Sequence, residues 1–226
     1  MNSLVIINPN SSQKVTDGID AAIDPLRSFG IPIQCLTLIE GPPGIETQRQ
    51  ADLTIAPMLA LAAAQENAAG FVIACFGDPG LHALRDQTSR PVVGIQEASV
   101  MTALTLGQRF GVISILSGSI PRHMRAFGAM GVMERLAGDR AIGLGVADLS
   151  DGDTCLDAMI AAGKTLRDKD GADVLIMGCA GMARYRARLE DATDLPVVEP
   201  TQAAASMALG RICLSLSHRT KRTENA

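Results

Sequence analysis

The chain has 226 residues, of which 47% are hydrophobic and only 3% aromatic, so a sizeable core must be built from aliphatic side chains. Its formal net charge of −4 argues against a general binder of nucleic acids or anionic membranes, and no apolar run approaches the roughly 18 residues of a membrane span. The first residues lack the basic region and long apolar run of a signal peptide, so we expect a soluble cytoplasmic protein.

The first half of the chain alternates short, β-branched apolar runs with longer alanine-rich stretches. Strands are expected at residues 4–7, 31–39, 71–74 and 92–95. The helices expected between and after them cover residues 12–28, 46–67 with a kink at Pro57, a segment after Pro79, and 96–106. Continuous apolar strands that alternate with helices predict an α/β fold with parallel sheets covered on both faces.

The second half follows the same rhythm. Strands are expected at residues 110–115, 141–146, 174–177 and 197–198, and helices at residues 120–130, 154–169, 182–190 and 202–216. The sequence itself also repeats: "GFVIACFGDPG" aligns with "DVLIMGCAGM", which places Cys75 over Cys179. Shortly after, "RPVVGIQEA" aligns with "LPVVEPTQA" at almost the same offset, which indicates an internal duplication.

The duplication predicts two similar parallel-sheet α/β lobes related by a pseudo-twofold axis, with the active site in the cleft between them. The first lobe would comprise residues 1–95 and 201–226, and the second residues 96–200. Ligands in open α/β sheets bind beyond the carboxyl ends of the strands, where Cys75 and Cys179 both stand. The axis would therefore bring the two thiols to opposite sides of one ligand.

Five cysteines without a signal peptide do not suit a disulfide framework, and their spacing does not suit a zinc site. Each cysteine therefore either fills space in the core, as a buried filler, or takes part in the chemistry of the site. Cys35, Cys155 and Cys213 lie within expected strands or helices, so we interpret them as fillers.

Two facing thiols suit the inversion of a stereocentre. One thiolate removes a proton from one face of a carbon, and one thiol returns a proton to the other face of the planar carbanion or enolate. A free thiol has a pKa of about 8.5, so we expect the N-terminus of the helix after each cysteine to stabilise the thiolate. Backbone N–H groups near Gly77, Gly80 and Gly181 could hold the developing enolate oxygen.

Three motifs carry a family resemblance: "INPNSS" at residues 7–12, "CFGDPG" at residues 75–80 and "GCAGM" at residues 178–182. The chain resembles the hydantoin and allantoin racemases of the aspartate/glutamate racemase superfamily over nearly its whole length, including "GPPGIE" and "FGVISILSGSIP". The resemblance implies racemisation of allantoin or a 5-substituted hydantoin, a small-molecule substrate, and a homo-oligomer. It implies Cys75 and Cys179 as the acid/base pair, with no cofactor.

The same resemblance implies which residues contact the substrate: Asn8, Phe76, Gly77, Ser117, Gly118, Ala180 and Gly181. One departure is Glu199, where the family often has aspartate. No metal is expected, since the histidines and cysteines lack metal-ligand spacing, and no phosphate-binding loop motif indicates a nucleotide.

Other functions are open to the same cleft. Amino-acid racemases of the superfamily usually have Asn-Thr after the first cysteine, where this chain has Phe76 and Gly77, which disfavours that activity. An arylmalonate-type decarboxylase needs one thiol, so a second cysteine in register argues against it. A small-molecule binding module would need no reactive thiol at all.

Several polar residues near these motifs have a structural explanation beside a functional one. Asn8 either holds its own turn or contacts a ligand. We expect Asp78 to cap the helix that follows it, and His82 to be a solvated residue of that helix rather than a group that tunes Cys75. Glu97 and Glu199 are expected to stabilise helix N-termini.

Overall fold

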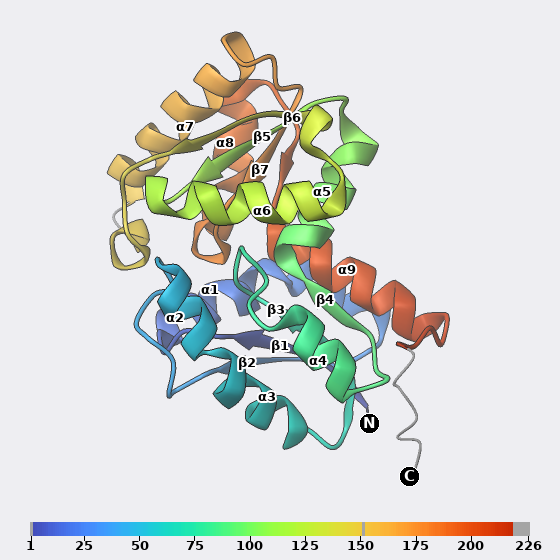
Figure 1. Ribbon diagram of the computed structural model, residues 1–226. Helices are drawn as coiled ribbons and strands as arrows, with labels where there is room; N and C mark the ends of the chain where they lie inside the picture. The colour runs from blue at the N-terminus through green and yellow to red at the C-terminus, as the bar shows by residue number, and fades with distance from the viewer. Residues whose placement is uncertain (1, 151, 219–226) are drawn as a thin grey trace.

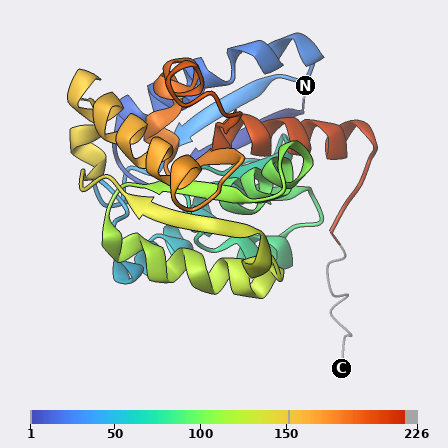
Figure 2. The same ribbon diagram turned by 90° about the horizontal axis from the view of Figure 1, so that it is seen from above.

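The computed structural model describes residues 2–150 and 152–218. In these ranges the strands form two four-stranded sheets, in which all neighbouring strands pair in parallel (Figure 1). Helices flank both sheets, and Figure 2 shows the second sheet between α6 and α7. The predicted α/β fold with two lobes is confirmed.

The first sheet has the strand order β2-β1-β3-β4. Its strands are β1 (Ser3–Asn8), β2 (Ile33–Thr37), β3 (Ala68–Ile73) and β4 (Val92–Gly94). The helices in this half are α1 (Gln13–Ala22), the 3₁₀ helix η1 (Asp24–Phe29), α2 (Gln48–Leu53), α3 (Ile55–Ala63), α4 (Leu81–Gln87) and α5 (Ile95–Leu106).

The second sheet has the order β6-β5-β7-β8. Its strands are β5 (Phe110–Ser114), β6 (Leu136–Ala141), β7 (Val174–Met177) and β8 (Val197–Val198). The helices in this half are η2 (Ser117–Ser119), α6 (Ile120–Met130), η3 (Met133–Arg135), η4 (Val146–Ser150), α7 (Gly152–Asp168), η5 (Ala180–Tyr185), α8 (Arg186–Thr193) and α9 (Pro200–Cys213).

The two sheets have the same connectivity, because β5 to β8 take the positions in their sheet that β1 to β4 take in the first. The strands β3 and β7 are therefore equivalent, and Cys75 and Cys179 each follow the carboxyl end of one of them. This agrees with the repeat in the sequence. The twofold axis and the lobe boundaries stay proposals, and residues 219–226 of the first proposed lobe lie outside the described residues.

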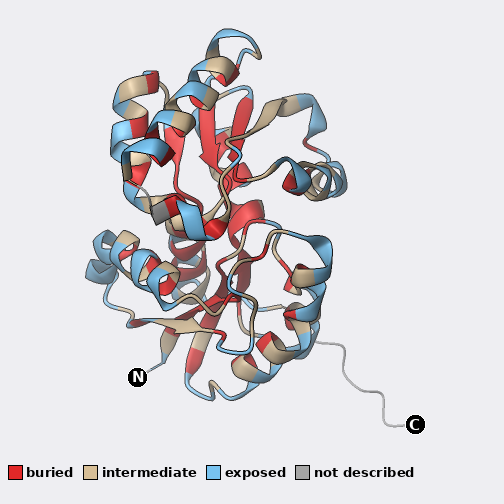
Figure 3. Cartoon of the chain, turned by 90° about the vertical axis from the view of Figure 1, so that its left-hand side faces the viewer, coloured by how far each residue is buried: buried red, intermediate tan, exposed pale blue. Residues whose placement is uncertain are grey.

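One hydrophobic core connects the sheets. It contains Leu4 and Val72 from the first sheet and Val112 and Ile176 from the second, all fully buried. Buried alanines of α5 and α9, such as Ala204, complete it, because small side chains let these helices pack closely between the sheets. Figure 3 shows the buried residues concentrated in the strands and in α9. The shared core fixes the carboxyl ends of β3 and β7 relative to each other.

Prolines divide two of the expected helices. Residues 46–67 form two helices rather than one kinked helix, and the break lies at Thr54 instead of Pro57. Proline cannot donate to the carbonyl four residues earlier and clashes with it, so Pro57 is accommodated in the first turn of α3. Pro25 acts similarly after α1, where the chain continues as the 3₁₀ helix η1.

One strand was misplaced. The apolar residues 141–146 were expected as a strand, but β6 is Leu136–Ala141, with the sequence LAGDRA. This strand lies at the edge of the second sheet and is only half-buried, so it lacks a continuous apolar run. The side chain of Asp139, within this strand, is nevertheless fully buried.

Candidate active site

Cys75 and Cys179 line the same small cavity, of about 30 Å³, between the two lobes. Each thiol is half-buried and free of any disulfide. The expected convergence of the two strand ends is therefore present in the structure. Of the cysteines expected to be fillers, Cys155 is buried and Cys35 half-buried, but Cys213 is exposed at the end of α9, so that interpretation was wrong for it.

Three of the expected substrate contacts, Phe76, Ala180 and Gly181, line this cavity beside the cysteines. The others are not part of its wall: Asn8, Gly77, Ser117 and Gly118. The Asn8 amide donates to Asn10 Oδ1 and Thr16 Oγ1, each at 3.0 Å, and so holds its own turn. A substrate contact by these four residues stays a prediction.

Several wall residues were missed by the sequence reasoning. Asn10 stands in the wall in place of Asn8, and Ser119 in place of Ser117 and Gly118. Arg122 and His123, from the first turns of α6, complete this side. The segment "IPRHMR" follows directly on the Ser-Gly-Ser loop, so its charged residues could have been considered.

The electrostatic environment differs between the two thiols. Burial raises the pKa of Cys179 to about 11, and a hydrogen bond from the backbone N–H of Gly181 opposes that rise. Burial also raises the pKa of Cys75, and the neighbouring Cys179 and Asp78 raise it further, while Arg122 lowers it. A backbone donor would therefore stabilise the Cys179 thiolate, and the Arg122 cation the Cys75 thiolate.

The helix N-terminus expected after each cysteine is present at only one of them. Cys179 is the N-terminal capping residue of η5, so the first N–H groups of that helix lie beside its thiol. After Cys75, the chain first makes a turn, and α4 begins only at Leu81. The cation Arg122 stands near Cys75 instead, as a group from another element of the fold.

Asp78 caps a different helix from the one expected. Its backbone is left-handed, with φ of 47°, and its carboxylate accepts from the backbone N–H of Gln96 and Glu97, both at 2.9 Å. These donors belong to the N-terminus of α5, not to α4, which follows Asp78 in sequence. Burial raises the pKa of Asp78 to about 7, although these two bonds lower it.

The remaining carboxylates and His82 match their expected structural roles. Glu199 accepts from Thr201 N at 3.0 Å and Gln202 N at 2.6 Å and caps α9. Burial raises the pKa of Glu199, and these bonds lower it. Glu97 accepts from the backbone of Gly94 at the start of α5, and His82 is exposed in the first turn of α4.

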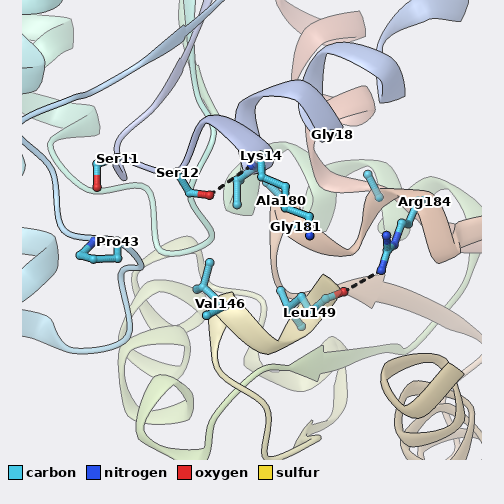
Figure 4. Close-up of a pocket in the computed structure, with 13 residues that line it drawn as sticks. Ser11, Ser12, Lys14, Gly18, Pro43, Val146, Leu149, Ala180, Gly181 and Arg184 are labelled. Carbon is cyan, nitrogen blue, oxygen red and sulfur yellow. Dashed lines mark hydrogen bonds between the residues drawn. The ribbon is translucent and has the colours of Figure 1, made fainter. Parts of the chain in front are cut away.

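A larger pocket of about 520 Å³ adjoins the cysteine cavity, and we call it the outer pocket. The two share Val15, Val146, Ala180 and Gly181 in their walls. Figure 4 shows Lys14 and Arg184 at the outer pocket, with Arg184 hydrogen-bonded to the carbonyl of Leu149 at 3.1 Å. Neither cation forms an ion pair with a carboxylate in the described part of the chain.

Among the described residues, no group of three or more histidine, cysteine, aspartate or glutamate side chains is arranged to hold a metal ion. None of the described helices combines the length and hydropathy needed to cross a bilayer.

Known proteins resemble this chain over most of its length. The family described as Asp/Glu/Hydantoin racemase matches residues 4–208. The hydantoin racemase of Paenarthrobacter aurescens is 32% identical, over 93% of this chain and 91% of that protein. The structure of allantoin racemase from Klebsiella pneumoniae has a TM-score of 0.89 at 29% identity, over 97% of this chain and 91% of the other. That of allantoin racemase from Pseudomonas fluorescens has a TM-score of 0.92 at 26% identity, over 99% of each chain.

Proposed function

The chain belongs to the Asp/Glu/hydantoin racemase family, and on that premise we propose that it racemises a five-membered hydantoin or ureide ring, with Cys75 and Cys179 as the acid and the base. The observation that carries this proposal is that both cysteines, from equivalent strands of two sheets, line one cavity. The hydantoin and allantoin racemases among its relatives support the choice of ring.

The chemistry follows from the acidity of the ring carbon beside a carbonyl group. The Cys179 thiolate removes the proton from one face, and the electron pair moves onto the carbonyl oxygen to form an enolate. The Cys75 thiol then gives its proton to the same carbon from the other face, which leaves Cys75 as thiolate and Cys179 as thiol. For the opposite enantiomer the two roles exchange, because each cysteine faces one side of the planar intermediate.

The size of the cavity adds a conformational step. Its volume of about 30 Å³ corresponds to roughly one water molecule, which is less than a five-membered ring occupies. We infer that the cleft between the lobes widens when the ring enters. Closure around the ring would then exclude water and strengthen the electrostatic interactions within the site.

The alternative functions would require different groups in the wall of the cysteine cavity. An amino-acid racemase must hold an ammonium and a carboxylate, whereas Phe76 after the first cysteine packs its ring against His123 at a centroid distance of 4.9 Å. A decarboxylase would use one of the two thiols. A non-catalytic binding module would leave both unreactive.

Optical rotation tests the proposal. One enantiomer of allantoin and one of 5-benzylhydantoin are incubated with the purified protein, and the rotation is followed with time. We expect rotation to decay to zero for at least one of them, faster than without protein. Constant rotation with both compounds and with the substrates of the matched pair below would refute the proposed function.

The raised thiol pKa values predict the pH dependence of the reaction. Catalysis needs one thiolate and one thiol, and burial raises the pKa of both cysteines above neutral pH. The active form is therefore a minor fraction near neutrality. We expect kcat/KM to rise with pH between about pH 6 and 9, approaching tenfold per pH unit. A flat profile over this range would contradict the assignment of thiols as the titrating groups.

The outer pocket predicts which ring substituent is preferred. Its contact with the cysteine cavity makes it the place for a substituent on the reacting carbon, and Lys14 and Arg184 favour a substituent that ends in an anion. The matched substrates 5-(2-carboxyethyl)hydantoin and 5-(2-carbamoylethyl)hydantoin differ only in this charge. We expect about fivefold lower KM for the carboxylate, as two exposed cations provide together about 1 kcal/mol.

The double substitution of Lys14→Gln and Arg184→Gln serves as the control for the charge effect. It should remove the difference in KM between the two substrates and leave the KM of the uncharged one nearly unchanged. Equal KM values with the unaltered protein would show that the two cations do not select the substituent.

A further inference from the structure

His123 is a buried histidine with one free ring nitrogen. Its side chain is 1% exposed, and it forms part of the wall of the cavity that holds Cys75 and Cys179. The Nε2 atom has no hydrogen-bond partner among the described residues. Leaving a buried polar atom unpaired costs about 1–3 kcal/mol, so a polar group that enters the cavity is its expected partner.

The other ring nitrogen is held firmly from the second sheet. His123 Nδ1 lies 2.8 Å from Asp139 Oδ2 and 3.3 Å from Ser114 Oγ, and Ser114 also donates to Asp139 Oδ1. The Asp139 side chain, on β6, is fully buried. The ring of Phe76 packs edge-on against the imidazole, and the ring of Phe127 lies at a centroid distance of 6.2 Å from it. These contacts fix the direction in which Nε2 points.

The side chains of His123 and Asp139 are both buried, so the net charge of the two together bears on whether Nε2 can donate a hydrogen bond. Asp139 forms no ion pair with an arginine or lysine in the described ranges, and a net charge in such a place is costly. A net-neutral pair, with one hydrogen between Oδ2 and Nδ1, leaves no uncompensated charge in this place. Whether that hydrogen belongs to the carboxyl or to the imidazole, Nε2 then carries a hydrogen and is a donor.

The neighbouring cation, Arg122, already has hydrogen-bond partners within the protein. Arg122 already donates to the carbonyl of Glu46 at 2.9 Å and to Ser119 Oγ at 3.2 Å. Its charge lowers the pKa of Cys75. Among the α6 side chains in this wall, His123 is thus the one with a buried nitrogen that lacks a partner.

We propose that His123 is a catalytic residue, which donates Nε2–H to the carbonyl oxygen beside the reacting carbon and stabilises the enolate as it forms. This inference rests on the proposed racemisation. Asp139 and Ser114 act as positioning residues that hold the imidazole in place. A fixed donor aimed at developing negative charge contributes more in the transition state than in the ground state, so it raises kcat.

Two substitutions separate the catalytic role from a merely structural one. The amide of His123→Asn can take the place of Nδ1, so it keeps the contact with Asp139 and loses the donor in the cavity. The longer amide of His123→Gln can take the place of Nε2, so it keeps that donor and loses the contact with Asp139. We expect kcat to fall about 10²–10³-fold in the asparagine variant, with KM changed only a few-fold. The glutamine variant should retain a larger part of kcat despite a lower Tm.

A purely structural role predicts the reverse order, with the asparagine variant active and the glutamine variant inactive, and that result would overturn the inference. If the His123→Gln variant does not fold, the His123→Asn variant is sufficient: a fall in kcat at unchanged Tm supports the catalytic role, and an unchanged kcat contradicts it. Nitrogen NMR of the unaltered protein gives a readout without substitution: we expect a hydrogen on Nε2 of His123, and a bare nitrogen there would contradict the proposal. If the unaltered protein does not racemise any of the rings tested, the proposed function fails first, and the variants are not needed to see it.

Discussion

Racemisation is expected to be lost when either Cys75 or Cys179 is replaced by serine. A serine hydroxyl is a far weaker acid than a thiol, so it neither provides the base nor returns the proton near neutral pH. General acid–base groups contribute about 10²–10⁴-fold each, so each single variant should lose at least the upper part of that range in kcat. The two single losses should be similar, because racemisation needs both groups in every turnover.

The single variants should nevertheless differ in partial reactions. Each retains one thiol, so exchange of the carbon-bound proton with deuterated water should survive for one enantiomer in each variant, and for opposite enantiomers in the two. Cys213→Ser is the matched control, because Cys213 is exposed at the end of α9, and its loss should leave kcat unchanged. Full activity in either the Cys75 or the Cys179 variant would exclude the two-thiol mechanism.

A single added methyl group at Gly178 is expected to reduce activity about as severely as the loss of a functional group. A Cβ atom at this position would lie 2.7 Å from the carbonyl oxygen of Ile113 and 3.2 Å from Cα of Ser114. The Gly178 N–H also donates to this same carbonyl at 2.8 Å, so the two strand ends are held at close range. Gly178→Ala must therefore move the end of β7, and with it the adjacent Cys179.

A displacement of about 1 Å at a reacting group can cost roughly 10²-fold in rate, so we expect a loss of that order in kcat/KM. Overpacking should also lower the free energy of unfolding by about 1–3 kcal/mol. Gly128→Ala, on α6, is the matched control, because a Cβ atom at this position would meet no neighbouring atom within 4 Å. The control should keep its activity and gain up to about 1 kcal/mol in stability. If Gly178→Ala left kcat/KM unimpaired, the close approach of β5 and β7 at Gly178 would not be what positions the Cys179 thiol.

The fold could be predicted where hydrophobic pattern and burial agree. The helix Ile120–Met130 and the strands Val174–Met177 and Val197–Val198 have the expected bounds. The strand Leu136–Ala141 was missed, since it lies at the edge of its sheet, is only half-buried and lacks a continuous apolar run. The repeat of two cysteine motifs indicated the convergence of β3 and β7, because equivalent strands in duplicated lobes end at equivalent places.

The polar contacts of the site could not be predicted in the same way. Asp78 has a left-handed backbone and caps α5, where its carboxylate accepts from Gln96 N, eighteen residues further along the chain. His123 and Asp139 come from a helix and an edge strand whose pairing no local pattern indicates. Such contacts depend on how the elements pack, whereas propensity and periodicity act within one element.

The most direct test of the two-thiol mechanism is the isotope pattern of racemisation in deuterated water. One enantiomer of a hydantoin that the protein racemises is converted for a small part of the reaction, and both enantiomers are then recovered and analysed by mass. With a separate base on each face, the newly formed enantiomer should carry deuterium at the reacting carbon, while the remaining starting enantiomer keeps its proton. Equal deuterium in both enantiomers from the beginning would indicate a single base that serves both faces, and would contradict the assignment of Cys75 and Cys179 as an acid/base pair.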